Sequence, residues 1–379
     1  CHLHSTKEVP YGLSRYMFNF ILQSAYHIKM LMCNKLQKAS EPMPSNFYVP
    51  PHYVPSLNLR DTEIAIKKIK DFFENTLAQE LSLTRVSAPL FVRPETGLND
   101  NLNGVERPVA FDVKHMDGAT VEVVQSLAKW KRMALGRYGF SAGEGLYTDM
   151  NAIRRDEEFD NLHSVYVDQW DWEIVITKEQ RNLDTLKNVV NKIYGVFKKT
   201  ENYICSIYPN LTRYLSEDIS FVTTQELEDL YPGMTPKERE TAYTKAHGSA
   251  CVMQIGGQLK SGIRHDGRAP DYDDWNLNCD ILFYYPVLDT AYEVSSMGIR
   301  VDEDSLLKQL EEAKCENRRH LPFHRQILEK KLPYTMGGGL GQSRICMFLL
   351  GKAHIGEVQS SVWPEEMQKA CEAGNIILL

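Results

Sequence analysis

The sequence lacks paired cysteines, an excess of basic residues and any long apolar run. Its eight cysteines are scattered without a CxxC pair in a chain of 379 residues, which is long enough to form a core without disulfides, so we expect reduced thiols. The formal net charge of -7 argues against a protein whose main task is to grip a nucleic-acid backbone. The apolar stretch at 16–22 is too short to span a bilayer, so we expect a cytoplasmic protein without a membrane partner.

The chain divides into a short irregular region and a long regular one. Five prolines between residues 42 and 55 break any regular element there, although residues 14–37 could form a helix. We therefore expect an N-terminal extension of unknown role over 1–57 and a single domain over 58–379, whose 43% hydrophobic content suits a large core.

The periodic segments predict strands that follow one another through tight turns, with helices outside them. Apolar residues at helical spacing predict a helix over 61–81, capped by Asp61 or Thr62. Asp117 and Gly118 predict a hairpin turn. Further helices are expected over 183–203, 224–231 and 236–246, a polar loop over 260–275, and two strands with a tight turn over 280–300. This order favours an α+β fold, an antiparallel β-sheet flanked by helices.

The strand HSVYVDQWDWEIVI, residues 163–176, carries polar residues in its middle. Alternation places Gln169, Asp171 and Glu173 on one face, with Trp170 and Trp172 on the other. Buried carboxylates are costly unless they are paired or meet a ligand. The polar face is therefore either the floor of a site or a solvent-facing edge, and this strand alone does not decide between them.

A second strand favours the site. Residues 290–300 place Glu293, Ser295 and Met297 on one face and end at Arg300. Two strands with such residues in apolar surroundings indicate a shared polar floor. Asp280 and Glu293 could together hold a divalent cation through oxygen ligands, as ATP sites require.

The segment MGGGLGQSRICMFLL, residues 336–350, predicts a glycine turn that runs into an apolar helix. Its glycines allow close backbone approach, and Arg344 near a helix start suits a phosphate or the face of a purine. Neither a P-loop nor a Rossmann glycine motif is present. Arg154, in the loop before the polar strand, could stabilise charge that develops on a phosphoryl group. The loop over 264–274 mixes both charge signs and is either solvated or part of the site.

Six ordered motifs carry a resemblance to a known family. They are SLAKWKR, FSAGEGLYT, HSVYVDQWDWE, RAPDYDDW, EVSSMGIR and GGGLGQSR. Over about 61–363 the sequence resembles the A-type, ammonia-dependent asparagine synthetases, or aspartate–ammonia ligases. The resemblance implies the catalytic fold of class II aminoacyl-tRNA synthetases over 58–379 and a homodimer. It departs from the family in a shorter span between Trp275 and Asp280.

The resemblance also implies a reaction and its partners. L-aspartate attacks the α-phosphorus of Mg²⁺-ATP to give β-aspartyl-AMP and pyrophosphate, and ammonia then displaces AMP to form asparagine; no nucleic acid takes part. Lys131 would donate to the substrate carboxylates and Asp171 would accept from its ammonium group. The implied catalytic residues are Asp100, Arg154 and Gln169. The implied aspartate-binding residues are Ser126, Lys131, Asp171, Ser295, Ser296, Arg268 and Asp273, of which the last two would close over the substrates. The implied ATP-binding residues are Arg154, Asp280, Glu293, Arg300, Arg344, Gly339 and Gly341, and of these Asp280 and Glu293 would hold the metal.

Two other functions share part of this chemistry. An aspartyl- or asparaginyl-tRNA synthetase core shares the adenylation step, but the acidic balance and the lack of room for an anticodon-binding domain count against it. A synthetase-like module that only senses an amino acid or a nucleotide would be expected to lose catalytic residues, whereas Arg154, Gln169, Asp280, Glu293 and Arg344 are all present.

Overall fold

The computed structural model describes residues 47–100, 102 and 106–379. The predictions for the first 46 residues, including the helix over 14–37, lie outside this described part. Of the predicted extension, the described residues Phe47, Val49, Tyr53 and Leu57 pack against the main core. The boundary at residue 57 stays a prediction.

The main sheet has eight strands in the order β1-β5-β6-β11-β10-β9-β8-β7. In that order the strands are β1 (Leu83–Arg85), β5 (Gly145–Ile153), β6 (Tyr166–Val175), β11 (Thr335–Gly341), β10 (Thr290–Arg300), β9 (Asp273–Tyr285), β8 (Ser249–Met253) and β7 (Ser220–Thr223). Only the edge pairs β1–β5 and β7–β8 are parallel, and the five pairs between them are antiparallel. The predicted antiparallel sheet with flanking helices is therefore confirmed.

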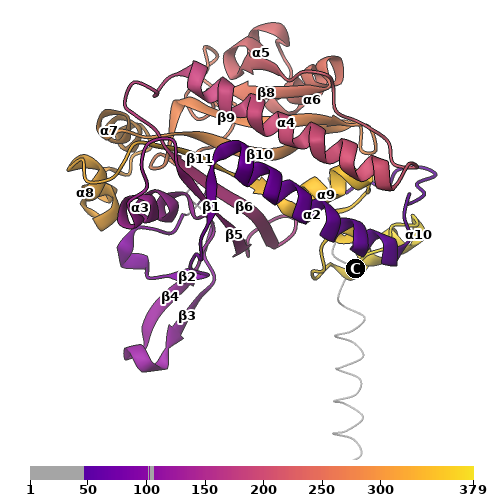
Figure 1. Ribbon diagram of the computed structural model, residues 1–379, viewed down its shortest axis with the longest axis horizontal. Helices are drawn as coiled ribbons and strands as arrows, with labels where there is room; N and C mark the ends of the chain where they lie inside the picture. The colour runs from indigo at the N-terminus through magenta and orange to yellow at the C-terminus, as the bar shows by residue number, and fades with distance from the viewer. Residues whose placement is uncertain (1–46, 101, 103–105) are drawn as a thin grey trace, which may run out of the picture. The chain divides into compact units, whose positions relative to one another are not determined.

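A smaller sheet of β2 (Phe91–Val92), β4 (Ala119–Val123) and β3 (Ala110–Val113) extends away from the main one (Figure 1). A short 3₁₀ helix, η2 (Lys114–Met116), leads into its turn. Asp117 and Gly118 have φ of 53° and 75° there. This left-handed backbone is the conformation that a tight turn needs, and the predicted hairpin is confirmed.

Nine α-helices lie within the described residues. They are α2 (Leu59–Leu81), α3 (Ala128–Tyr138), α4 (Leu183–Ile207), α5 (Thr224–Leu230), α6 (Pro236–His247), α7 (Glu303–Glu312), α8 (Pro322–Leu328), α9 (Gln342–Leu350) and α10 (Glu365–Ala373); η1 (Pro94–Thr96), η3 (Glu316–His320) and η4 (Ile355–Glu357) are 3₁₀ helices. The predicted cap of the first helix is wrong: Asn58 caps α2, and its side chain accepts from the backbone N–H of Asp61. In the described part of the chain, no helix is both long and apolar enough to cross a membrane.

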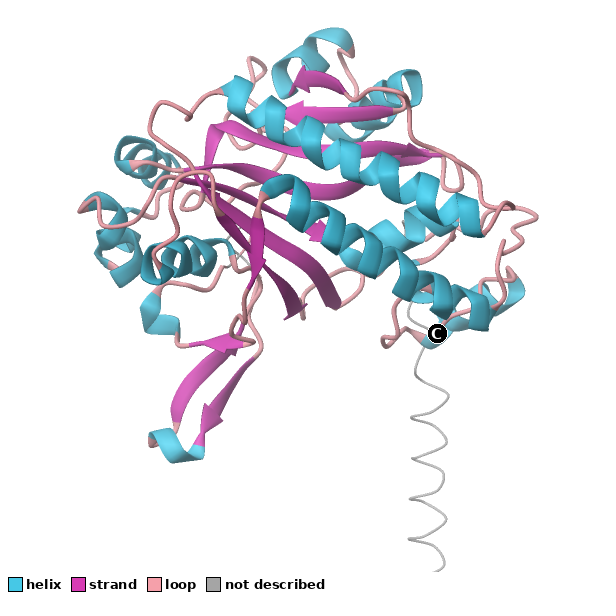
Figure 2. Cartoon of the chain, viewed as in Figure 1, coloured by secondary structure: helices cyan, strands magenta, loops and turns pink. Residues whose placement is uncertain are grey.

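Helices cover both faces of the main sheet (Figure 2). On one face, α2 and α4 pack over Trp170 and Trp172 of β6, with Phe73 stacked on Trp170 at 4.9 Å and Phe197 edge-on to Phe73 at 5.0 Å. The other face is covered in two parts, by α3, α7 and α8 at one end and by α5 and α6 at the other. The two tryptophans are therefore core residues, which leaves the polar face of β6 turned away from α2 and α4.

The predicted glycine turn is wrong, because Thr335–Gly341 forms strand β11 between β6 and β10. A Cβ atom on Gly337 would lie 2.0 Å from Oε2 of Glu173, and one on Gly339 would lie 2.3 Å from Oε1 of Gln169. Glycine is needed at these positions because the side chains of Glu173 and Gln169 occupy the space that a Cβ atom would take. The apolar helix α9 follows directly, as expected.

The predicted polar loop over 260–275 is too long. Strand β9 begins at Asp273 and continues through Asp280 to Tyr285. The residues between Trp275 and Asp280 are therefore part of a continuous strand, and no loop intervenes there.

Candidate active site

A cavity of about 350 Å³ lies over the polar face of β6, β11 and β10. All the residues predicted for the site line it except Ser295 and Asp280. Those that line it are Asp100, Ser126, Lys131, Arg154, Gln169, Asp171, Arg268, Asp273, Glu293, Ser296, Arg300, Gly339, Gly341 and Arg344. The polar face of β6 is the floor of this cavity and not a solvent-facing edge.

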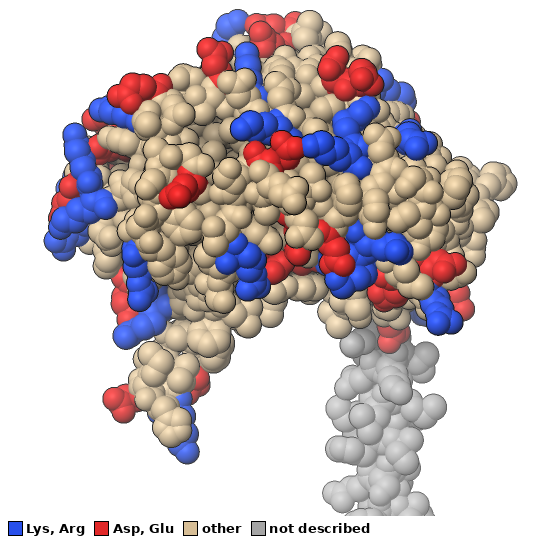
Figure 3. All heavy atoms as spheres, viewed as in Figure 1, with Lys and Arg blue, Asp and Glu red and all other residues tan. Residues whose placement is uncertain are grey.

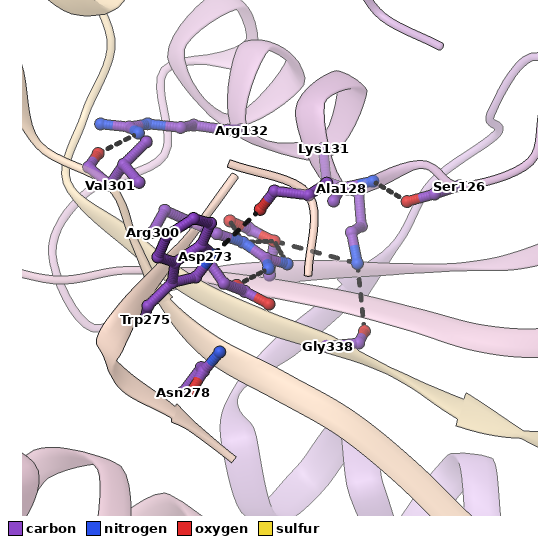
Figure 4. A network of polar contacts seen from close by, with 12 residues as sticks. Ser126, Ala128, Lys131, Arg132, Asp273, Trp275, Asn278, Arg300, Val301 and Gly338 are labelled. Carbon is purple, nitrogen blue, oxygen red and sulfur yellow. Dashed lines mark hydrogen bonds and ion pairs between the residues drawn. The ribbon is translucent and has the colours of Figure 1, made fainter. Parts of the chain in front are cut away.

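Lys131 reaches from α3 down to the sheet and is fully buried (Figure 4). Its ammonium group is paired with Asp171 and donates to the carbonyl oxygens of Trp172 and Gly338, each at 3.0 Å. Glu173 lies 3.8 Å from the same nitrogen. The three N–H donors of Lys131 are thus engaged, whereas Oδ2 of Asp171 accepts no hydrogen bond from the described residues. Asp171 keeps a free acceptor for an ammonium group.

Arg300 lies beside Lys131 in a second buried network. Its Nη2 donates to Oε2 of Glu173 at 2.6 Å and its Nε to Oε1 at 2.9 Å, while Nη1 is paired with Asp273. Burial alone would raise the pKa of Glu173, but Arg300 holds it below its usual value. Burial raises the pKa of Asp273 despite the same arginine. The position of Asp273 at the start of β9 makes it part of the floor, so the prediction that it lies on a closing loop is wrong.

Two arginines face the cavity from its rim. Arg154 directly follows the last residue of β5, and its side chain is 25% exposed. Arg344 lies in the first turn of α9, donates to the carbonyl oxygen of Glu293 at 3.0 Å and is 22% exposed. In contrast to Lys131 and Arg300, both guanidinium groups remain accessible to a charged ligand.

Asp280 and Glu293 are two neighbouring acidic residues close to Arg268. Arg268 is paired with one oxygen of Asp280, and the other oxygen, Oδ1, is buried with no hydrogen-bond donor among the described residues. Burial raises the pKa of Asp280 to about 6, with Glu293 adding to the effect. Burial would also raise the pKa of Glu293, but Arg344 and Lys237 lower it.

No cluster of three or more potential metal ligands occurs among the described residues. Mg²⁺ in nucleotide sites is usually held by one or two carboxylates together with substrate phosphates and water. The free oxygen of Asp280 and the partly exposed carboxylate of Glu293 fit that kind of site.

A β-bulge changes which residues of β10 face the cavity. Glu293 is paired with Leu282 and Ser295 with Ile281, so the register shifts at Val294. A bulge inserts one residue and reverses the alternation beyond it. Ser296, and not Ser295, therefore shares the cavity with Glu293, and Ser295 is buried outside it. The predicted face Glu293, Ser295, Met297 is wrong for this reason.

Asp100 lies at the end of the cavity near α3 and is 3% exposed. Its Oδ1 accepts from the backbone N–H of Leu102 at 3.0 Å. Burial raises its pKa to about 6, although Lys129 acts in the opposite direction. A carboxylate with this pKa is suited to exchange a proton near neutral pH.

Asp168, on the tryptophan face of β6, positions α9. Its carboxylate accepts from the backbone N–H of Ser343 at 3.0 Å, from Oγ of Ser343 at 2.8 Å and from Lys70 at 3.0 Å. A carboxylate at a helix N-terminus is stabilised by the free N–H groups and the helix dipole. Asp168 thereby holds the helix turn that carries Arg344.

Sequence reasoning missed Gln125 and Tyr272, which also line the cavity. Gln125 precedes the predicted Ser126 at the junction between β4 and α3, and Tyr272 precedes Asp273. Their proximity to predicted residues was the only available signal, because neither belongs to an alternating polar face.

A family model described as aspartate–ammonia ligase matches residues 60–375. The aspartate–ammonia ligase of Ruminiclostridium cellulolyticum is 71% identical over 330 residues, covering 87% of this chain and 98% of that protein. The aspartate–ammonia ligase of Clostridium perfringens is 64% identical over 332 residues, covering 88% and 99%.

Solved structures with a similar fold are aminoacyl-tRNA synthetases. Asparaginyl-tRNA synthetase from Pyrococcus horikoshii, complexed with asparaginyl-adenylate, has a TM-score of 0.56 and 16% identity, covering 80% of this chain and 70% of that one. Its counterpart from Entamoeba histolytica has a TM-score of 0.54 and 13% identity, covering 79% and 66%. This likeness shows the class II synthetase fold.

Proposed function

Because the chain belongs to the aspartate–ammonia ligase family, we propose that it makes L-asparagine from L-aspartate and ammonia with ATP, through β-aspartyl-AMP. One observation carries the proposal: a single cavity holds two accessible arginines, Arg154 and Arg344, close to free acceptors for an ammonium group. The arginines suit the triphosphate and the acceptors suit an amino acid.

In the first step the side-chain carboxylate of aspartate attacks the α-phosphorus of ATP, and pyrophosphate leaves. Two anions must approach each other, so fixed cations have to stabilise the charge that develops on the phosphoryl oxygens. Arg154 and Arg344 supply this charge from the rim of the cavity. Asp171, oriented by Lys131, accepts from the α-ammonium group of aspartate.

Mg²⁺ would be held by Asp280 and Glu293, where it neutralises phosphate charge when it is bound with ATP. The protein itself contributes Arg268, which fixes one oxygen of Asp280 and leaves the other free.

In the second step ammonia attacks the β-carbonyl carbon of the adenylate and AMP leaves. In this proposal Asp100 takes a proton from the incoming ammonium ion, and its pKa of about 6, which leaves it ionised at neutral pH, supports that role. Gln169, which lines the cavity beside Gly339, orients the acyl group.

The proposed enzyme is a cytoplasmic homodimer that binds no nucleic acid. On the face drawn in Figure 3, acidic and basic side chains are interspersed and form no extended basic stripe. The net charge of -7 also disfavours a tRNA partner. The mass of the protein in solution, measured by light scattering, tests the dimer.

The activity is tested with one set of assays that follow AMP, pyrophosphate and asparagine. We expect all three products to form together when aspartate, Mg²⁺-ATP and ammonium are supplied, and much less asparagine when glutamine replaces ammonium. Stimulation of AMP formation by tRNA and not by ammonium would contradict the proposal. So would tight aspartate binding without any product.

A further inference from the structure

Four residues that line the cavity, Asp100, Gln125, Asp171 and Gln359, each have a buried side-chain oxygen without a hydrogen-bond donor among the described residues. Two of these oxygens, Oδ2 of Asp100 and Oε1 of Gln125, belong to residues that are hydrogen-bonded to each other. Asp100 is 3% exposed and Gln125 is 0% exposed, and both line the cavity. A buried acceptor without a donor costs about 1–3 kcal/mol. Two such acceptors in one cavity point to a ligand that is rich in donors.

The orientation of Gln125 is set by its surroundings. Its Nε2 donates to the backbone carbonyl of Asp100 at 2.9 Å, and its backbone N–H donates to Oδ1 of Asn99 at 3.0 Å. The same Asn99 oxygen accepts from the backbone N–H of Asp100 at 3.0 Å. Reversing the amide would place two oxygens against each other, so Oε1 is the free end. The side chain of Gln125 is thus hydrogen-bonded to the backbone of Asp100, and each of the two residues keeps one acceptor oxygen without a donor among the described residues.

We infer that Oε1 of Gln125 holds the ammonium ion beside Asp100, an inference that rests on the proposed function, in which Asp100 already takes a proton from that ion. Ammonium has four N–H donors and no acceptor, which matches a site made of unpaired oxygens. Another free acceptor of the cavity, Oδ2 of Asp171, lies on the floor beside Lys131 and serves the α-ammonium group of aspartate. The two ammonium groups of the reaction therefore have separate acceptors.

The charges around Asp100 leave it able to hold a cation. Lys129 donates to the carbonyl oxygen of Asn99 at 3.2 Å, but its charge is offset by Asp271 at 2.9 Å. Asp271 also accepts from His324 at 2.9 Å and Arg318 at 3.2 Å. Lys129, the cation with the largest effect on Asp100, is thus directed to Asp271, whereas Arg154 acts on Asp100 more weakly. Oδ2 of Asp100 has no donor among the described residues.

The chemical step follows from this placement. Asp100 takes one proton from ammonium, and the ammonia nitrogen forms a bond to the β-carbonyl carbon of the adenylate. The bond between that carbon and the AMP oxygen breaks, AMP leaves with the electron pair, and the nitrogen loses a second proton to solvent. Gln125 holds the ammonium ion by accepting a hydrogen bond and does not exchange a proton.

The test is the Gln125→Met variant of the full chain, with ammonium chloride as the varied substrate. Losing one hydrogen bond to a charged ligand should raise the KM for ammonium about tenfold or more. The KM for aspartate and the aspartate-dependent exchange of pyrophosphate into ATP should stay within about twofold, because neither involves ammonium. Gln79→Met, on the exposed side of α2, is the matched control and should leave all three unchanged.

An unchanged KM for ammonium overturns the inference, and so does a rise in the KM for aspartate instead. If Gln125→Met does not fold, Gln125→Asn decides the question: it keeps the amide but withdraws the oxygen by one methylene group, and it should raise the KM for ammonium alone. A wild-type protein that exchanges pyrophosphate and forms no asparagine would reject the proposed function itself, which is a different result.

Discussion

The floor and the rim of the cavity are both charged, but their charges are used differently. On the floor, Lys131, Glu173 and Arg300 are almost completely buried and paired with one another or with neighbouring groups. On the rim, Arg154 and Arg344 are about a quarter exposed, and Asp100 keeps an oxygen free. The floor therefore satisfies most of its charges internally and keeps one free acceptor on Asp171, while the rim keeps its cations partly exposed to a ligand.

The comparison predicts that a rim cation can be removed without loss of fold. Arg154→Ala should reduce aspartate-dependent pyrophosphate exchange by about a hundred- to thousandfold, the usual cost of losing a group that stabilises developing charge. Its unfolding midpoint in urea should stay unchanged. Arg155→Ala, one residue further along and exposed, is the control and should retain exchange. Near-normal exchange in Arg154→Ala would remove this arginine from the mechanism.

The floor should respond in the opposite way, through stability. A Cβ on Gly337 would lie 2.0 Å from Oε2 of Glu173, so Gly337→Ala must displace the carboxylate that pairs with Arg300. We expect a loss of about 1–3 kcal/mol in the free energy of unfolding, as for other overpacked cores, measured by urea denaturation.

The control for Gly337 is Gly195 in α4, where an added Cβ meets no described atom within 4 Å. Gly195→Ala should raise the free energy of unfolding by about 0.5–1 kcal/mol, because alanine favours the helix. Equal effects at the two glycines would contradict the distinction between a packed floor and an open surface.

Asp100 should show that a buried carboxylate with a free acceptor oxygen lowers the stability of the folded protein. Burial raises its pKa in the folded state to about 6, above the value near 3.9 expected in an unfolded chain. The folded state therefore binds more protons between these two values, and its stability falls as pH rises through that range. Asp100→Asn, which carries no charge, should be more stable than wild type at pH 8 by on the order of 1 kcal/mol.

That gain should shrink as the pH is lowered from 8 towards 4, where Asp100 is protonated in the folded state and about half protonated in the unfolded chain. Thermal unfolding at the two pH values measures it. A gain that does not change with pH would mean that the ionised carboxylate is stabilised by its surroundings and is not a strained, ligand-ready group.

Much of the site could be predicted from single segments. Alternation along residues 163–176 correctly separated Gln169 and Asp171 from the two tryptophans. Ser295 was misplaced because a bulge at Val294 reverses the alternation. A bulge depends on pairing with β9, which local periodicity does not report.

The sequence by itself determined the local elements and the residue types of the cavity, because propensity and alternation act over a few neighbouring residues. Only the tertiary structure decided that the glycines of β11 lie between β6 and β10, where they make room for Glu173 and Gln169. It also decided which polar atoms have hydrogen-bond partners. The three N–H donors of Lys131 are all engaged by groups of the sheet, whereas Asp100 and Gln125 each keep one oxygen without a donor among the described residues. The physical reason is that hydrogen-bond partners and burial come from segments far apart in the chain.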